Sequence, residues 1–382
     1  MAKVAIICDR ELFSPFDQRV WKGALTVKKA GHFVEIITPH LNNEFKKIDG
    51  IPIYCIGKSR IPGITALKIM DKALRGEYDL FHCHEFDPLI FSLILKLLKK
   101  KNIVWDCHEH YASVLSTKIK HNGKVEQNYL KEKILTLMIN FCAKRATAIM
   151  SVTPPLVEYY RKIKPTFSIP NFPNQKLFNP RRYNNDVQKI YAGKKVVIYQ
   201  GGIKPGRGLT TLLSAMEIVI QKENNVLFVI VGGEIDNSGW NEKTNRFLVK
   251  YKDNFIATGW IKHSELAPYL VHANVGIIMF KPTHYNNIIG LPNKLFEYIS
   301  CGLPVISSEM PQISRIINST KTGILVNPND PEHIAKSILQ IIDSSQNNIY
   351  KANSKKYASS FVWEKNEPKL IKLYQKLDNK KI

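Results

Sequence analysis

The sequence lacks several features that would assign it to a common class of protein. Its longest strongly apolar run, Leu89–Leu98, has about ten residues, roughly half of a membrane span, and contains Lys96. The first residues, MAKVAIICDR, have no charged-then-apolar signal pattern. The six cysteines include no CxxC pair, and we expect them to be reduced and structural. These absences predict a cytoplasmic protein.

Acidic residues are also scarce. The 382 residues include 32 Asp and Glu against 55 Lys and Arg, which gives a net charge of +23. Such an excess predicts an anionic partner: nucleic acid, anionic lipid or a phosphorylated substrate. No DNA- or RNA-binding motif is present. The chain has no G-x-S-x-G elbow, and CDRELFSPFDQR after the first expected strand contains no glycine, which argues against a dinucleotide dehydrogenase.

Apolar runs alternate with helical stretches through both halves of the chain. Continuous apolar strands between helices predict buried parallel sheets, here an α/β protein of two doubly wound Rossmann-like domains. The expected strands are 4–8, 33–38, 79–84 and 103–108, then 195–200, 226–232, 255–259, 275–280, 304–308 and 323–326. A Pro- and Asn-rich linker is expected at 171–192. We place the domains at 1–180 and 190–362, with a last helix at 363–380 that returns to the first domain.

The strongest local signal is GLPNKLFEYISCGLPVISS at 290–308. Pro292 suits the start of a short helix, Asn293–Ser300. The helix N-terminus could bind a diphosphate, and Glu297 could accept hydrogen bonds from ribose hydroxyls. The alternative is an ordinary amphipathic helix with Lys294 and Glu297 on its surface.

A second signal is GGIKPGRGL at 201–209, after the strand KVVIYQ. Glycines allow close approach of the backbone to a ligand, and Lys204 and Arg207 add positive charge. The G-x-x-x-x-G spacing resembles a phosphate loop, but Arg207 replaces its lysine and Gly208 its hydroxyl residue. A metal-free diphosphate clamp is the preferred interpretation, and a solvated turn is the alternative.

Two histidine-acid clusters, HCHE at 82–85 and DCHEH at 106–110, end strands of the first half. The carboxyl ends of parallel strands are where ligands bind in such sheets. Substrate contacts are the preferred interpretation. Zinc held by His84, His108 and a carboxylate, or purely structural histidines, are the alternatives.

The ordered set of motifs resembles the retaining glycosyltransferases of family 4, which have the GT-B fold of two Rossmann-like domains facing a cleft. The resemblance runs from FDQRVWKGALTVKKAGHFVEIIT through DLFHCHEFDPL, IVWDCHEHY, SIPNFPN and YQGGIKPGRGL to PNKLFEYISCGLPVISS and WEKNEPKLIKLY. The PNKLFEY motif identifies a branch of the family. The resemblance implies an enzyme that transfers a hexose or N-acetylhexosamine with retention of configuration.

The resemblance also implies roles for particular residues. His108, Glu109, Arg207 and Glu297 would be catalytic, and His108 would lie near the reacting centre. The donor would be held by Gly201, Gly202, Lys204, Arg207, Ile261, Leu291, Pro292, Asn293, Lys294 and Glu297. The family's first glutamate falls at Ile289, which leaves the contacts to the donor sugar open.

The same resemblance implies no metal and no cofactor other than the donor, because the leaving phosphate would accept the acceptor's proton. We expect a uridine diphosphate sugar as donor and a lipid-linked or polysaccharide acceptor. The alternatives are a nucleotide-sugar epimerase of the same architecture, a protein that binds nucleic acid or another anion, and a catalytically silent subunit.

A membrane partner is expected from the region Lys96–Arg145, which has eleven Lys and Arg against four Asp and Glu. Lysines 118, 120, 124, 131 and 133 could hold the enzyme at the anionic inner face of the plasma membrane. Within the region, Leu130, Ile134, Leu137, Met138 and Phe141 have helical spacing. We expect this stripe to pack on the sheet of the first domain.

Overall fold

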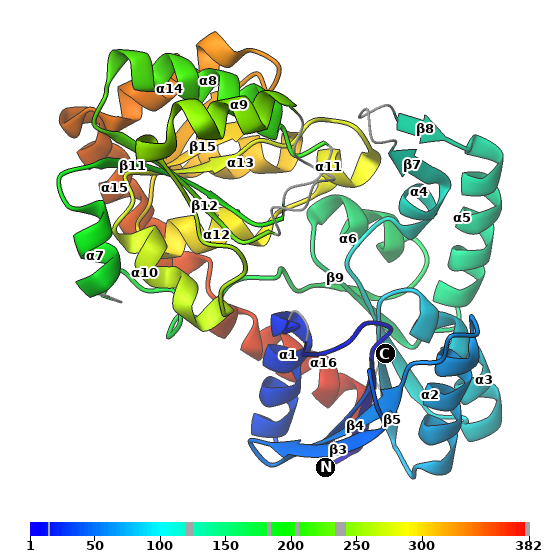
Figure 1. Ribbon diagram of the computed structural model, residues 1–382. Helices are drawn as coiled ribbons and strands as arrows, with labels where there is room; N and C mark the ends of the chain where they lie inside the picture. Colours follow the sequence, from blue (N-terminus) through cyan, green and yellow to red (C-terminus); the bar gives the residue numbers. More distant parts are fainter. Residues whose placement is uncertain (14–15, 120–124, 182–184, 203–205, 234–241, 379–382) are drawn as a thin grey trace. The chain divides into compact units, whose positions relative to one another are not determined.

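The computed structural model describes residues 1–13, 16–119, 125–181, 185–202, 206–233 and 242–378. The chain forms two compact units (Figure 1). Unit 1 comprises Met1–Ser116, Asn128–Asn171 and Glu364–Ile382, and unit 2 comprises Thr117–Gln127 and Phe172–Trp363. Lys204, which we expect in the donor loop, and Lys120 and Lys124, which we expect at the membrane, lie outside the described residues.

Unit 1 is built on an eight-stranded sheet in the order β10-β9-β6-β5-β1-β2-β4-β3, parallel except for the antiparallel pair β3 and β4. Its strands are β1 (Lys3–Ile7), β2 (Phe33–His40), β3 (Glu44–Ile48), β4 (Ile51–Gly57), β5 (Leu80–His84), β6 (Asn102–Cys107), β9 (Ala148–Ser151) and β10 (Thr166–Ser168). Its helices are α1 (Gln18–Lys29), α2 (Ile64–Arg75), α3 (Asp87–Lys99), α4 (Tyr111–Ser116), α5 (Tyr129–Ala143), α6 (Pro154–Arg161) and α16 (Glu367–Asp378).

Helices cover both faces of the unit 1 sheet. Figure 1 shows α1 and α16 on one face and α2, α3 and α5 on the other. The last helix is fixed to unit 1 by its own side chains: the Tyr374 hydroxyl lies 2.7 Å from Nδ1 of His82, and Glu367 pairs with Lys29 at 2.8 Å. The central strands are therefore buried on both sides, as their continuous apolar sequences predict.

Unit 2 holds a six-stranded, fully parallel sheet in the order β13-β12-β11-β14-β15-β16. The strands are β11 (Lys195–Gln200), β12 (Val226–Val231), β13 (Phe255–Ala257), β14 (Val275–Ile278), β15 (Val305–Ser308) and β16 (Gly323–Val326). The helices are α7 (Asn185–Tyr191), α8 (Leu209–Lys222), α9 (Glu242–Lys250), α10 (Leu266–Val271), α11 (Tyr285–Ile289), α12 (Asn293–Ser300), α13 (Pro311–Thr320), α14 (Pro331–Ile342) and α15 (Ser344–Tyr357). A small antiparallel hairpin pairs β7 (Thr117–Ile119) with β8 (Val125–Gln127).

The unit 2 core has two layers, because alternate residues of β11 face opposite sides of the sheet. Val197 and Tyr199 belong to the layer under α8 and α14, and Val196 and Ile198 to the layer under α10, α12 and α13. Strand order reverses between β11 and β14 in unit 2, and between β1 and β5 in unit 1. In open α/β sheets, ligands bind at the carboxyl ends of the strands beside such a reversal.

One expectation from the sequence is met only in part, and one is wrong. The two units divide at 171/172, where the expected linker begins. Part of the expected linker at 171–192 is ordered structure, since α7 lies within it and Phe178 is buried in the unit 2 core. The apolar stripe of α5 does not pack on the sheet: α5 buries Ile139, Cys142 and Ala143 instead. The five residues of the stripe are exposed. Within the described ranges, no helix is long and apolar enough to cross a membrane.

Candidate functional site

The first candidate site lies at the carboxyl end of β11, where α12 approaches it. Pro292 precedes the helix with φ −70°, and α12 begins at Asn293, as the sequence predicts. Lys294 and Glu297 are only 8% and 4% exposed. The alternative of a surface helix carrying both charges is therefore wrong. Burying two charged groups is costly, so their partners decide what the site can bind.

The Glu297 carboxylate is held by two polar side chains. The Gln200 side-chain amide donates to its Oε2 at 2.5 Å, and Nε2 of His263 lies 2.8 Å from its Oε1. Neither partner is marked by a sequence motif of its own: Gln200 is the last residue of β11, and His263 lies in the short 3-10 helix η2 (His263–Glu265). A carboxylate accepts about four hydrogen bonds, so Glu297 keeps the capacity to accept from ligand hydroxyls.

Lys294 is a buried amine beside the strand end. Its Nζ donates to the Gln200 carbonyl at 2.7 Å and lies 4.3 Å from the centre of the Tyr199 ring. Burial, reinforced by the positive charge of Arg207, lowers the pKa of Lys294 to about 7, against the opposing effect of Glu297. A nearby anion would restore the charged form.

Arg207 supplies a second positive charge at this place. The Phe280 ring lies 4.6 Å from its guanidinium carbon and 5.5 Å from Nζ of Lys294. Within the part of the chain that the structure describes, neither cation forms an ion pair with a carboxylate. Arg207, together with Lys294 in its protonated form, can therefore attract an anionic group.

The backbone beside the cations is shaped by glycines. Gly208 has φ +70°, and a Cβ there would lie 2.4 Å from the Met279 carbonyl oxygen. Gly201 has φ +107° at the end of β11, and a Cβ would lie 3.9 Å from Nζ of Lys294. Gly202 has open space where a Cβ would be. Gly201 and Gly208 thus have backbone conformations that a residue with a Cβ rarely adopts, at the end of β11 and directly before α8.

The remaining expected donor residues have mixed environments. Ile261 and Leu291 are partly buried against the core layer under α10, α12 and α13, and Asn293 is exposed at the start of α12. Ile289, where the resemblance implies a missing acid, is 6% exposed in α11. That position is an apolar packing position in this chain.

The second candidate site lies in unit 1 and is centred on Asp106 at the end of β6. Arg19 of α1 binds both carboxylate oxygens, Nε to Oδ2 at 2.8 Å and Nη2 to Oδ1 at 2.7 Å. A further donor of Arg19 reaches the Ile169 carbonyl at 2.8 Å. Arg19 and Asp106 are 3% and 1% exposed. From the sequence, Asp106 could be named only as part of DCHEH, and no pattern marks Arg19 as its partner.

His108 lies between two carboxylates. Its Nε2 is 3.2 Å from Oδ2 of Asp106, and its Nδ1 is 2.8 Å from Oε1 of Glu85. Burial opposes protonation, but Glu85 and Asp106 outweigh it and raise the pKa of His108 to about 10. Tyr111 also donates to Glu85. His108 is therefore a charged imidazolium at neutral pH, while Glu109 is partly buried beside it.

The two histidines of β5 are fully enclosed. His82 and His84 are 0% and 2% exposed, and their rings stack at 4.5 Å. Burial lowers the pKa of His84 to about 3, so its imidazole is neutral. His82, His84 and Asp106 place one ligand atom each within 4.8 Å of one another. A metal there would compete with Arg19 for both oxygens of Asp106.

Comparison with known proteins identifies the superfamily of the chain. The family model described as Glycosyltransferase Family 4 matches residues 24–173. The model described as Glycosyl transferases group 1 matches residues 194–344. The chain belongs to the GT-B glycosyltransferase superfamily.

Curated relatives of this GT-B member are distant. The 2-deoxystreptamine N-acetyl-D-glucosaminyltransferase of Niallia circulans is 26% identical over 48% of this chain. The putative teichuronic acid biosynthesis glycosyltransferase TuaH of Bacillus subtilis (strain 168) is 23% identical over 63% of it. The matched segments span 45% and 64% of those two relatives.

Solved structures resemble the whole chain. Sucrose-phosphate synthase from Thermosynechococcus elongatus superposes with a TM-score of 0.77 and 20% identity, covering 99% of this chain and 100% of that one. Anabaena Alr3699/HepE, solved with UDP-glucose, has a TM-score of 0.72 and 14% identity over 98% and 100% of the two chains. The predicted α/β fold of two Rossmann-like GT-B domains is confirmed.

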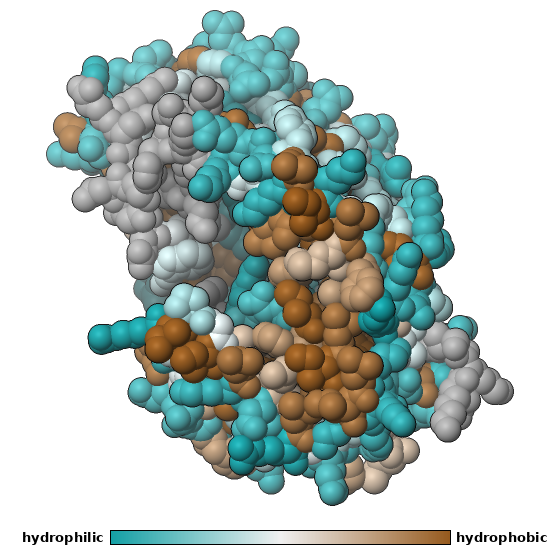
Figure 2. All heavy atoms as spheres, turned by 90° about the vertical axis from the view of Figure 1, so that its right-hand side faces the viewer, coloured by the Kyte–Doolittle hydropathy of each residue, from teal (hydrophilic) through white to brown (hydrophobic). Residues whose placement is uncertain are grey.

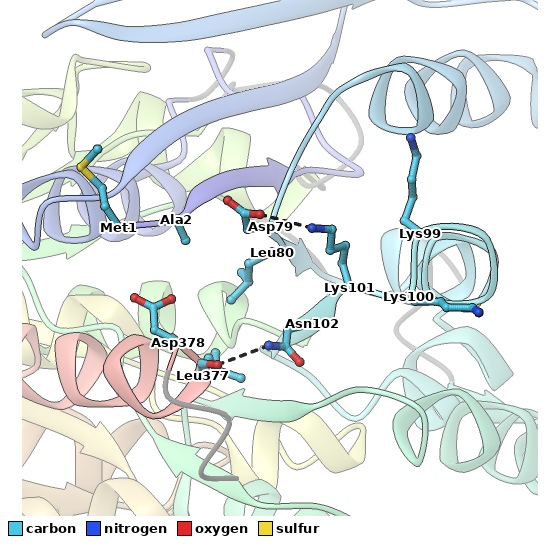
Figure 3. Close-up of a pocket in the computed structure, with 10 residues that line it drawn as sticks. All are labelled: Met1, Ala2, Asp79, Leu80, Lys99, Lys100, Lys101, Asn102, Leu377 and Asp378. Carbon is cyan, nitrogen blue, oxygen red and sulfur yellow. Dashed lines mark hydrogen bonds and ion pairs between the residues drawn. The ribbon is translucent and has the colours of Figure 1, made fainter.

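A hollow of roughly 620 Å³ elsewhere on this GT-B member lies at the opposite end of the unit 1 sheet. Figure 3 shows it beside the first residues of β1, β5 and β6 and the end of α16. Lys101 pairs with Asp79 at 3.2 Å, and Asn102 donates to the Leu377 carbonyl at 3.4 Å. None of the candidate site residues lines it, so it is separate from both candidate sites.

Proposed function

We propose that this chain is a retaining, metal-independent glycosyltransferase of family 4. It transfers a hexose or N-acetylhexosamine from a nucleotide diphosphate sugar, with uridine diphosphate as the carrier, to a lipid-linked or polysaccharide acceptor at the cytoplasmic face of a membrane. The observation that carries the proposal is the group of Lys294, Arg207 and Glu297 at the carboxyl end of β11. Arg207 and Lys294 supply positive charge and form no ion pair within the described residues. The buried Glu297 carboxylate is held in one orientation by Gln200 and His263.

The donor fits this group by its chemistry. The diphosphate is an anion that Arg207 and Lys294 attract, while the ribose carries hydroxyls that donate to Glu297. As the sugar leaves, charge grows on the diphosphate, and fixed cations there stabilise the transition state. Lys204 would add to this charge. The likeness to a structure solved with UDP-glucose supports uridine diphosphate as the carrier.

Unit 1 contributes His108 and Glu109 in this proposal. His108 offers a positive charge held in one orientation by Glu85 and Asp106. In front-face transfer the leaving phosphate accepts the acceptor's proton, so no protein base is required. The neutral His84 and the guanidinium-bound Asp106 complete a charge-balanced cluster, which supports a mechanism without a metal.

The proposed donor site predicts a pH-dependent proton uptake. At pH 8 most Lys294 amines are neutral in the free protein, because the pKa is about 7. A bound diphosphate favours the ammonium and raises this pKa, so binding at pH 8 takes up close to one proton, and binding at pH 6 takes up little. Calorimetric titration with UDP in two buffers of different ionisation enthalpy measures the uptake.

Lys294→Met is the matched variant for this experiment. It removes the amine and keeps most of the side-chain length, and proton uptake at pH 8 should disappear. Equal uptake by the wild type and Lys294→Met, or none by the wild type, would place the diphosphate away from Lys294.

A further inference from the structure

The helices α3 and α5 leave apolar side chains uncovered on the surface of unit 1. Leu97 is 75% exposed on α3, and Leu130 and Leu137 are 70% and 66% exposed on α5. The other large apolar residues exposed on the two helices are Ile94, Leu98, Tyr129, Ile134, Met138 and Phe141. We call this set the α3–α5 face.

The α3–α5 face is continuous. The two helices pack side by side, and Lys96 of α3 donates to the Arg145 carbonyl beyond α5 at 2.6 Å. On α5, positions 130, 134, 137 and 141 follow the spacing of one helical face. Figure 2 shows the apolar side chains gathered in one patch over this side of the molecule. Contiguous apolar surface of this kind marks a binding surface.

Basic residues are frequent in and directly after the two helices. Residues 87–101 and 129–145 contain eight Lys and Arg against two Asp and Glu. The Arg145 guanidinium carbon lies 3.4 Å from the centre of the Phe141 ring, so this charge rests on the apolar surface. Long basic side chains can bury their stems in an apolar layer and keep the charge at its polar edge.

We propose that the α3–α5 face is a membrane-docking surface whose apolar side chains enter an anionic bilayer. Helices with an apolar face and a basic border bind at the headgroup boundary of anionic lipids. A second copy of this chain is the less suitable occupant, because two such faces would bring like charges together. This proposal rests on the membrane association in the proposed function and adds insertion of apolar side chains to charge attraction. It does not depend on which donor the enzyme uses.

Insertion differs from pure charge attraction in its response to salt. Salt screens attraction between exposed charges and lipid phosphates, whereas burial of apolar surface persists. The wild type should therefore keep a measurable part of its binding to anionic vesicles at high ionic strength.

Co-sedimentation with phosphatidylcholine vesicles containing phosphatidylglycerol, at low and high salt, tests the surface. Leu97→Ser with Leu137→Ser should lower the vesicle partition coefficient about tenfold, through lost apolar burial. The control is Val249→Ser with Ile349→Ser, two exposed apolar residues of unit 2 (79% and 56% exposed), which should sediment like the wild type.

Three results would overturn the proposal. The first is equal sedimentation of the two double variants, and the second is no binding of the wild type to anionic vesicles. The third is a wild-type dimer, detected by light scattering, that the Leu97→Ser, Leu137→Ser double variant no longer forms. UDP affinity, measured on the same proteins, should be unchanged. Failure of the membrane test with normal UDP binding would leave the donor site standing.

Discussion

Asp106→Asn should lower the free energy of unfolding of unit 1 by about 3–5 kcal/mol. Removing one partner of a buried ion pair leaves the other charge uncompensated in the interior. Here Arg19 would remain buried at 3% exposure with an amide in place of a bidentate carboxylate. Hydrogen exchange of the β6 amides reports the loss locally, and denaturant unfolding reports its size.

The control is a solvent-exposed ion pair of unit 1. Asp71 and Arg75 of α2 pair at 2.9 Å with side chains 56% and 78% exposed. Exposed pairs contribute about 0–1 kcal/mol, so Asp71→Asn should change stability little. If Asp106→Asn is as mild as Asp71→Asn, Asp106 is not the anchor that joins α1 to the end of β6.

Glu297→Gln and Arg207→Ala should each weaken UDP binding by about ten- to hundredfold. Each removes a charge-assisted hydrogen bond of about 1.5–3 kcal/mol. Glu297→Gln keeps the shape of the side chain but replaces one acceptor oxygen with an amide donor, which then faces the donor of either Gln200 or His263. Arg207→Ala removes one of the two cations against Phe280.

Glu265→Gln and Arg315→Ala are the matched controls, because both residues are exposed in the same unit. Calorimetry should give them the affinity of the wild type, and circular dichroism should show all four variants folded. Wild-type affinity in both Glu297→Gln and Arg207→Ala would remove the donor from the carboxyl end of β11.

Much of the fold could be predicted because its signals are local. A short apolar run such as the VVIY within KVVIYQ is typical of a buried parallel strand, and the structure has β11 at the predicted residues. The helix Asn293–Ser300 also lies where the sequence predicts it, since Pro292 and Gly302 bracket it. The hairpin β3–β4 was not predicted, because the β3 sequence, EFKKI, is largely exposed and has no apolar run.

The partners within the candidate sites depend on distant parts of the chain. Arg19 and Asp106 are 87 positions apart, and Gln200 and Glu297 are 97 apart. No local pattern marks such pairs; only the order of the strands brings them together. The histidines of HCHE and DCHEH could be named from sequence, but His82 and His84 are buried in the interior, which favours the structural alternative over substrate contacts for these two.

The exposed stripe on α5 shows where pattern reasoning fails. Helical spacing of Leu130, Ile134, Leu137 and Phe141 shows that one face is apolar, but the same spacing suits a core or a lipid surface. The structure buries Ile139, Cys142 and Ala143 instead. Two of these three side chains, Cys142 and Ala143, are small and allow close packing, while the larger apolar side chains of the stripe face outward.

The most direct measurement of the central claim is proton NMR of UDP-glucose and UDP-N-acetylglucosamine incubated with the protein in EDTA. The account predicts that the protein consumes one of these donors without added metal, and that the first sugar product, free or transferred, has the anomeric configuration of the donor. Release of the opposite anomer first, activity that EDTA abolishes and zinc restores, or consumption of neither donor would contradict it.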